Sequence, residues 1–228
     1  MKTISESKNL RSLSLSLFAL ILLTLAFTSC KKDKKDVNVD LSAFVRVTNA
    51  SAASTPQDFF LDTTKLTASA VAYGSSTDYL KTTTGDHQGS FKNSGSATVN
   101  VSFNLSLAAG KYYSAFYSDS SKYATFIDDR TTPQAGKARI RFINLSSALA
   151  SSVDFGATGA AKLVSSLAYK SASAYYDVDP TTAFSLYASG STTAIISLPT
   201  TIEAGHIYTI YVSGATTGTV TSHLVTEN

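Results

Sequence analysis

The sequence contains an internal repeat, which restricts the range of folds open to it. Residues 43–51 (AFVRVTNAS) align with residues 138–146 (ARIRFINLS), and Ala, Arg, Asn and Ser coincide at four of the aligned positions. Further along, Asp58-Phe59 aligns with Asp154-Phe155. The matches keep their order at a nearly constant offset, so the simplest interpretation is two copies of one domain.

The two copies meet in a short polar stretch. Residues 129–136 read DRTTPQAG, and Pro and Gly among charged and hydroxyl side chains are typical of a linker. We therefore predict a first domain at residues 41–130 and a second, repeated domain at residues 137–228. Units of this length suit small sandwiches.

Each copy has the alternating pattern of β-strands. In residues 99–107 (VNVSFNLSL) every second side chain is apolar and the others are Asn or Ser. Because successive side chains of a strand point to opposite faces, this pattern buries one face and leaves the other in water. Many short strands in units of this length predict an all-β fold of two tandem, immunoglobulin-like antiparallel β-sandwiches.

The amino terminus has the features of an export signal. A positively charged start precedes an uncharged, Leu-rich run at residues 12–27, which is short for a membrane-spanning helix. Small residues then lead to Cys30. This pattern resembles the lipobox of bacterial lipoproteins, with Phe27 where those proteins usually have Leu. We predict a signal peptide at residues 1–29 and a lipid on Cys30; the alternative is an uncleaved anchor with an ordinary thiol.

Residues 30–40 are predicted to be a lipidated cysteine followed by a charged tether. Residues 31–36 read KKDKKD, without apolar periodicity. Lys31 directly after the cysteine resembles lipoproteins sorted to the outer membrane of Gram-negative bacteria. The mixed charges resemble a surface-export signal only ambiguously. We expect a lipid-anchored outer-membrane protein, on the periplasmic side or at the cell surface.

Charge and cysteine content exclude two possibilities. The whole chain carries +3, and residues 1–29 hold three basic side chains and one acidic one, so the exported chain is left with +1. A nearly neutral chain with scattered basic residues is not expected to bind nucleic acid. Cys30 is the single cysteine, which rules out an intramolecular disulfide.

The second copy resembles a bacterial family catalogued as domain of unknown function 4397. The resemblance rests on the Arg-rich opening at residues 139–146, the following Val153-Asp154-Phe155, and the later segments at residues 167–169 and 204–209. It covers residues 137–213 well and residues 43–118 weakly. The resemblance implies tandem β-sandwiches on exported proteins and brings no catalytic residue with it.

A search for chemistry in the sequence predicts no catalytic, cofactor or metal site. His87, His206 and His223 lack a second His or Cys at metal-ligand spacing. The carboxylate pairs Asp128-Asp129 and Asp177-Val178-Asp179 supply too few oxygens for Ca²⁺. No Gly-x-Ser-x-Gly motif is present. We therefore predict that the protein is not an enzyme.

Two sets of repeated residues leave alternatives open. Arg46 and Arg141 recur with Asn49 and Asn144, and we favour hydrogen bonding at strand ends over ligand binding. Repeated tyrosines suit either a sugar-stacking platform or cross-strand aromatic packing, and their recurrence favours packing. The tyrosines concerned are Tyr73, Tyr79, Tyr169, Tyr175 and Tyr176.

The predicted function is that of a lipid-anchored envelope protein, a non-enzymatic binding or structural module. Its partners would be the membrane, through the lipid on Cys30, and a protein or glycan ligand. The alternative is a lipoprotein-derived fimbrial or adhesin subunit. Asp62-Thr63-Thr64 resembles a short O-glycosylation signal of some exported proteins, and the sequence leaves open whether it is modified.

Overall fold

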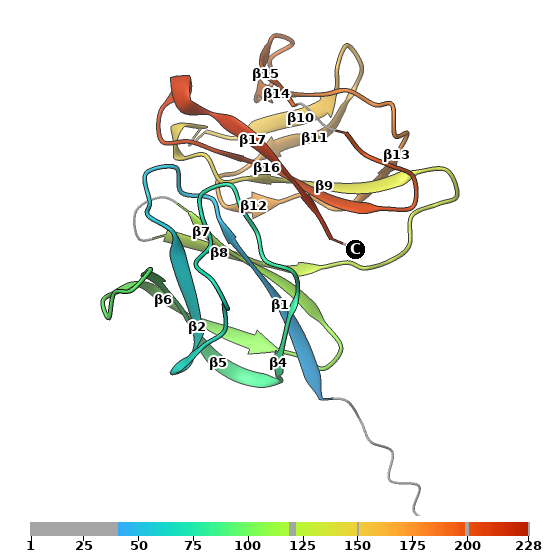
Figure 1. Cartoon of the computed structure of the whole chain (residues 1–228). Helices are drawn as coiled ribbons and strands as arrows, with labels where there is room; N and C mark the ends of the chain where they lie inside the picture. The colour runs from blue at the N-terminus through green and yellow to red at the C-terminus, as the bar shows by residue number, and fades with distance from the viewer. Residues whose placement is uncertain (1–40, 119–121, 150, 199–200, 228) are drawn as a thin grey trace, which may run out of the picture. The chain divides into compact units, whose positions relative to one another are not determined.

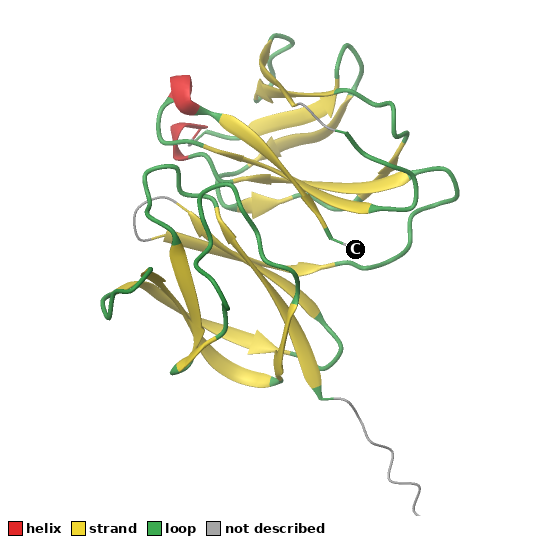
Figure 2. Ribbon diagram, viewed as in Figure 1, coloured by secondary structure: helices red, strands yellow, loops and turns green. Residues whose placement is uncertain are grey.

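The structure is a computed structural model that describes residues 41–118, 122–149, 151–198 and 201–227 (Figure 1). The predicted signal peptide, Cys30 and the tether lie outside the described residues. What is described belongs to one compact unit, Asp40–Asn228. The chain is all-β, as predicted, and two sandwiches follow each other along it (Figure 2).

The first sandwich consists of two four-stranded sheets. One sheet has the order β4 (Leu80–Thr83), β1 (Ser42–Asn49), β7 (Tyr112–Ser118) and β8 (Lys122–Asp128). The other has the order β3 (Thr64–Lys65), β2 (Gln57–Leu61), β5 (Gly85–Asn93) and β6 (Val99–Leu107).

The second sandwich repeats this arrangement with one additional strand. Its first sheet has the order β12 (Ser171–Ala172), β9 (Ala138–Asn144), β16 (Ile207–Ser213) and β17 (Thr221–Thr226), with β13 (Tyr176–Val178) also paired to β9. Its other sheet has the order β11 (Lys162–Leu167), β10 (Val153–Ala157), β14 (Phe184–Ala188) and β15 (Ala194–Leu198). The internal repeat is therefore a repeat of topology.

Each sandwich contains one parallel strand pair, a detail that the sequence pattern does not reveal. β1 runs parallel to β7, and β9 runs parallel to β16. The other pairings are antiparallel, as predicted. Arg46 lies opposite Ser114 in one parallel pair, and Arg141 lies opposite Thr209 in the other. This shared register defines which residues of the two copies are equivalent.

Helical structure is scarce among the described residues. It consists of two single turns, η2 (Ser147–Leu149) and η3 (Thr217–Thr219). Within the described ranges, no helix has the length and apolar character needed to span a membrane.

Each sandwich has its own hydrophobic core, and a third cluster joins the two. Ala43, Val45 and Val47 of β1 point into the core of the first sandwich and are fully buried. The third cluster combines residues of both sandwiches: Ala50, Phe116, Ala124, Ile143, Leu145, Tyr211 and Val225. The sheets that contain β1 and β9 are thus covered on both faces, which is why the burial in β7, β9 and β16 is almost continuous.

Strand β6 confirms the predicted alternation and lies at an edge of its sheet. Phe103, Leu105 and Leu107 are buried, whereas Asn104 is exposed. At the outer end of the strand the pattern weakens, and Val99 is 47% exposed. Across the sheet, a Cβ on Gly89 would lie 2.7 Å from the Phe103 ring, so the strand β5 needs glycine there.

The register of β6 makes a testable prediction. Phe103 is 5% exposed and stacks on Tyr123 at a centroid distance of 4.1 Å. Phe103→Ala removes this burial and leaves a cavity, so the free energy of unfolding should fall by about 3–5 kcal/mol. Asn104→Ala changes a solvated side chain and should cost less than about 1 kcal/mol. Urea denaturation of both variants measures the difference; equal losses would contradict the assigned register.

Candidate functional site

The strongest group of interacting charges lies between the two sandwiches. Arg141 on β9 forms ion pairs with Asp128 at the end of β8, in the other sandwich, and with Glu227 just after β17, at an Nη2–Oε1 distance of 3.3 Å. The three side chains are 2%, 0% and 1% exposed, respectively. Arg141 also donates through Nε to Thr209 Oγ1 at 2.7 Å and through Nη1 to the Ile127 carbonyl at 3.2 Å.

Both carboxylates receive the same kind of hydroxyl donors. Tyr79 and Ser114 donate to Asp128 Oδ2 at 2.7 and 2.6 Å. In the other copy, Tyr175 and Thr209 donate to Glu227. Asp128 and Glu227 occupy equivalent places in the two repeats, each beside the first residue of the neighbouring strand. Asp128 pairs with Tyr112 of β7, and the Glu227 amide donates to the Ile207 carbonyl of β16. The two repeats therefore supply equivalent hydroxyl donors to the two carboxylates of the network.

Burial explains the electrostatics of this network. It raises the pKa of Glu227 above its ordinary value, although Arg141 acts in the opposite direction. It likewise raises the pKa of the Tyr79 and Tyr175 hydroxyls. Shifted pKa values often mark active sites, but buried ion-pair networks shift them too. Since Arg141 and Glu227 have almost no exposed surface, a substrate has no access to them, and the arrangement is that of a structural interface.

Aromatic packing extends the same interface. Phe116 on β7 and Tyr211 on β16 occupy equivalent positions in the two repeats and meet edge-on, with ring centroids 5.4 Å apart. Tyr73 of the first sandwich contacts the second, because its hydroxyl oxygen lies within hydrogen-bond distance, 2.9–3.2 Å, of Ser213 Oγ, Thr221 Oγ1 and His223 Nε2. The packing between the sandwiches is thus close to symmetric.

The repeated tyrosines accordingly have a packing role, for most of them across the interface between the sandwiches. Tyr73, Tyr79 and Tyr175 bond to groups at the interface. Tyr169 lies under the Lys122 ammonium, 5.6 Å from its ring centroid, and Tyr176 packs against the core of the second sandwich. They do not form the common exposed platform that stacking on a sugar requires.

The repeated asparagines confirm their predicted role at strand ends. Asn49 Oδ1 accepts from the Ser51 amide at 3.1 Å, and its Nδ2 donates to the Val71 carbonyl at 3.1 Å. Asn144 repeats the first bond with the Ser146 amide at 3.2 Å. The arginines depart from the prediction, because Arg141 bonds across the interface instead of at its strand end.

The other carboxylates singled out in the sequence are engaged in ion pairs. Asp129 and Asp177 both contact Arg139, at 2.6 and 3.2 Å, and Asp179 contacts Lys137 at 2.7 Å. The Thr131 hydroxyl, more than any other group, lowers the pKa of Asp129 to about 2. Asp128 points inward to Arg141, so the neighbouring aspartates Asp128 and Asp129 serve different partners.

The three histidines lie apart in the sequence, and each contacts different residues. His87 pairs with Asp62 at 2.8 Å, and this hydrogen bond raises the pKa of His87. His206 lies 3.9 Å from Glu203. His223 stacks on Tyr211 with centroids 4.6 Å apart, and burial lowers its pKa. Among the described residues, no group of three or more His, Cys, Asp or Glu side chains is placed to hold a metal ion.

Asp62-Thr63-Thr64 forms the turn between β2 and β3. Asp62 adopts a left-handed backbone conformation with φ +56° and accepts from the Gln88 amide at 2.8 Å. Thr63 and Thr64 are exposed. Modification of this turn remains a prediction.

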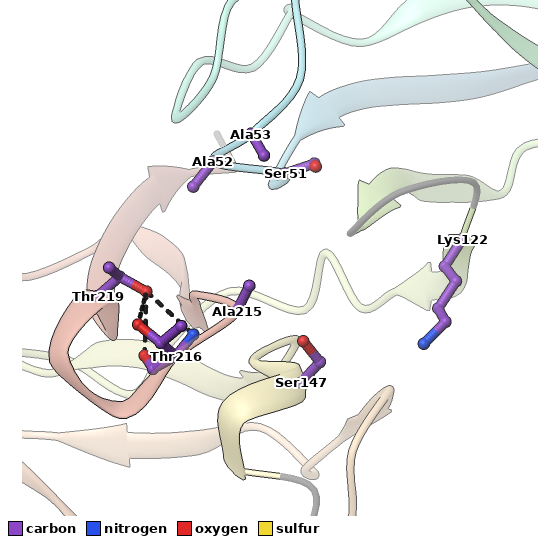
Figure 3. Close-up of a pocket in the computed structure, with 8 residues that line it drawn as sticks. All are labelled: Ser51, Ala52, Ala53, Lys122, Ser147, Ala215, Thr216 and Thr219. Carbon is purple, nitrogen blue, oxygen red and sulfur yellow. Dashed lines mark hydrogen bonds between the residues drawn. The ribbon is translucent and has the colours of Figure 1, made fainter.

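An open pocket lies where loops of the two sandwiches meet (Figure 3). Its volume is about 440 Å³. The first sandwich contributes the loop after β1 and the start of β8; the second contributes η2 and the loop after β16. The lining residues are Ser51, Ala52, Ala53, Lys122, Ser147, Ala215, Thr216 and Thr219.

The described lining of this pocket is small and polar. Methyl groups and hydroxyls make up most of it, and Lys122 adds an ammonium. Among the described lining residues there is no histidine or carboxylate that could act as a general base for the serines. Thr216 and Thr219 bond to each other, with 3.0 Å between their Oγ1 atoms, which holds the loop in shape (Figure 3).

Most of the interface network was not predicted from the sequence. Ser114, Thr209 and Glu227 were not recognised, and Asp128 was considered only as a loop carboxylate. A signal was available, because polar side chains recur at equivalent positions of otherwise apolar strands in both repeats. Reading it required the pairing of β1 with β7 and of β9 with β16, which the repeat alignment does not provide.

Comparisons with known proteins found a family but no curated relative. The family described as Domain of unknown function (DUF4397) matches residues 43–156. The match begins in β1, takes in the whole first sandwich and ends in β10. The sequence resemblance, by contrast, was stronger in the second copy. No curated protein matches the chain.

One solved structure aligns over most of the chain. It is the crystal structure of CBMbc (family CBM26) from Eubacterium rectale Amy13K in complex with maltoheptaose. The identity is 12% and the TM-score 0.26, and the alignment covers 80% of this chain and 96% of that chain. Likeness at this level carries no argument about function.

The buried network predicts an asymmetric response to substitution. Arg141→Met leaves two buried carboxylates without their cation, so the free energy of unfolding should fall by about 3–5 kcal/mol. Arg139→Met breaks more exposed pairs and should cost about 1 kcal/mol or less. Urea denaturation compares the two variants.

A second comparison separates charge from packing. Adding Asp128→Asn and Glu227→Gln to Arg141→Met removes the two stranded charges, so much of the lost stability should return. A loss in Arg141→Met no larger than that in Arg139→Met would contradict the structural role of the network.

Proposed function

The chain belongs to the DUF4397 family of domains of unknown function, and from this premise we propose that it is a non-enzymatic binding or structural module of the bacterial envelope, held there by a lipid on Cys30. The observation that supports the proposal best is the contrast between the interface network and the described lining of the pocket of Figure 3. The ionisable groups with the largest pKa shifts are sealed inside the interface, whereas the open pocket offers hydroxyls, methyl groups and one ammonium.

The rigidity of the module fits a role in display or binding. A hydrophobic cluster and a buried ion network join the sandwiches. The two sets of loops that line the pocket are therefore held together through these contacts, and such preorganisation lowers the entropic cost of binding.

We propose a protein segment, in preference to a glycan, as the occupant of the pocket. Carbohydrate faces are commonly bound by exposed aromatic rings, and no aromatic ring is among the pocket-lining residues that the structure describes. The repeated tyrosines that suggested such a platform are committed to the interface or the core. Hydroxyls and an ammonium beside methyl groups instead suit the carbonyls and small side chains of a peptide chain.

The anchor and the location are part of the proposal. The export signal, the small residues before Cys30 and the charged tether support attachment to the outer membrane. Lys31 directly after the cysteine supports outer-membrane sorting. The membrane would then be the first partner of the protein.

The lipid can be tested by feeding cells an alkyne-labelled fatty acid. We expect label on the wild-type chain and none on Cys30→Ser, because the thiol that forms the thioether is lost. Ser29→Ala keeps a small residue before the cysteine and should retain the label. Undiminished labelling of Cys30→Ser would refute the anchor. Proteinase K added to intact cells then decides the leaflet: degradation indicates the surface, and protection the periplasmic side.

The pocket can be tested by photocrosslinking in cells. Ala215, which lines the pocket, is replaced by p-benzoylphenylalanine, and the exposed Ser102 on β6 serves as the control position. We expect a discrete, protease-sensitive adduct from position 215 and none from position 102. Equal adducts at both positions, or none at 215, would contradict a binding role for the pocket. A ladder of the chain crosslinked to itself would favour the fimbrial alternative.

A further inference from the structure

Arg46 is the repeat equivalent of Arg141, but it lacks the partners that Arg141 has. It lies opposite Ser114 on the parallel neighbour strand, as Arg141 lies opposite Thr209. Arg46 is only 5% exposed, and its Nε and Nη1 atoms are buried without a hydrogen-bond acceptor. The Arg46 guanidinium lies over the Tyr79 ring, with its Cζ atom 4.2 Å from the ring centroid.

A guanidinium in this condition is costly. Buried N–H groups without acceptors lose the hydrogen bonds that water would provide, and a buried charge without a counter-ion adds to that cost. The nearby carboxylates are already occupied: Asp128 by Arg141, Tyr79 and Ser114, and Glu227 by Arg141 and hydroxyl donors. The cation–π contact with the Tyr79 ring stabilises the face of the guanidinium, but it provides no acceptor for the N–H groups at the edge.

The Arg46 side chain lines a small cavity. The volume is about 210 Å³, and the walls come from the loop between β3 and β4 and from the end of β17. The other lining residues are Gly74, Ser76, Thr77, Asp78, Leu224, Val225 and Thr226. Asp78 is exposed, and no ion pair between it and Arg46 occurs among the described residues.

We propose that this cavity is a binding site for a small oxyanion, a carboxylate or a phosphate, with Arg46 as its principal ligand. The planar guanidinium presents parallel N–H groups that match two oxygens of such an anion. Arg141 demonstrates the preference in the equivalent position, because it is satisfied by the carboxylates Asp128 and Glu227. An anion beside Arg46 would supply the counter-charge that Arg141 receives from Asp128 and Glu227.

The same chemistry has two sources: a free anion or an acidic side chain of a bound peptide. The cavity is separate from the pocket of Figure 3, because the two share no lining residue. The inference therefore does not depend on the proposed function.

The test is thermal unfolding of the full chain in neutral detergent, at constant ionic strength. Chloride is replaced stepwise by inorganic phosphate, by acetate, or by a short poly-glutamate peptide. We expect a saturable rise in the melting temperature of the wild type with at least one of these ligands. A response to phosphate or acetate identifies a free anion as sufficient, and a response to the peptide alone identifies an acidic segment.

Three variants locate the effect. Arg46→Gln should lower the apparent affinity by about tenfold or more, since it removes the charge and the paired donors. Arg46→Lys keeps the charge but not the paired donors, and its affinity should fall between those of the wild type and Arg46→Gln. Lys111→Gln removes a positive charge from an exposed turn and should leave the response unchanged.

Two results would overturn the proposal. One is a wild type whose melting temperature does not rise with any of the three ligands. The other is an equal rise in the wild type and Arg46→Gln. If Arg46→Gln does not fold, Arg46→Lys decides between these results in the same titration.

Discussion

The ion pairs of Arg141 with Asp128 and Glu227 are the interaction on which the arrangement of the two sandwiches depends. They bring a cation from the second repeat to carboxylates of both repeats in a region almost without exposed surface. Replacing such a network by apolar side chains often costs little stability, whereas removing one member costs much. Its members come from both sandwiches, so the complete network forms only when the two sheets pack against each other.

The interface is that of a symmetric pair built within one chain. In a twofold dimer the same patch of each subunit meets itself. Here Phe116 meets its equivalent Tyr211, and each carboxylate has a tyrosine and a second hydroxyl donor from its own repeat. The symmetry fails at the arginines, where Arg141 binds both carboxylates and Arg46 binds neither. One arginine is enough for the network, which leaves the other available for a different ligand.

The functional features follow from this joining of repeats. Neither sandwich alone has the pocket of Figure 3 or the cavity at Arg46, because each is lined from both sides. The interface also takes up the tyrosines and most of the buried charges. Small and hydroxyl-bearing side chains consequently make up much of the described lining of the two spaces, with Lys122 at the pocket and Arg46 and Asp78 at the cavity. This distribution agrees with the proposed binding role.

The sequence by itself determined the local and repeated features of the protein. Alternation predicted the inward face of β6 at Phe103, Leu105 and Leu107, and the repeat predicted two sandwiches of the same topology. The asparagines at the ends of β1 and β9 were interpreted correctly, because their hydrogen bonds reach residues close by in the chain. The family resemblance was also readable from short motifs. These properties depend on a period of two or on neighbouring residues, both of which a sequence displays directly.

Only the tertiary structure decided how the repeats meet. A period of two says that Arg46 and Arg141 point away from their own cores, but it does not say whether water or another sheet receives them. The edge position of β6, the parallel pairing of β1 with β7, and the meeting of Arg141 with Asp128 and Glu227 are all contacts between distant segments. The physical reason is that a charged side chain can be buried at low cost only when its counter-charges are buried beside it. The packing of two complete sheets meets this condition for Arg141.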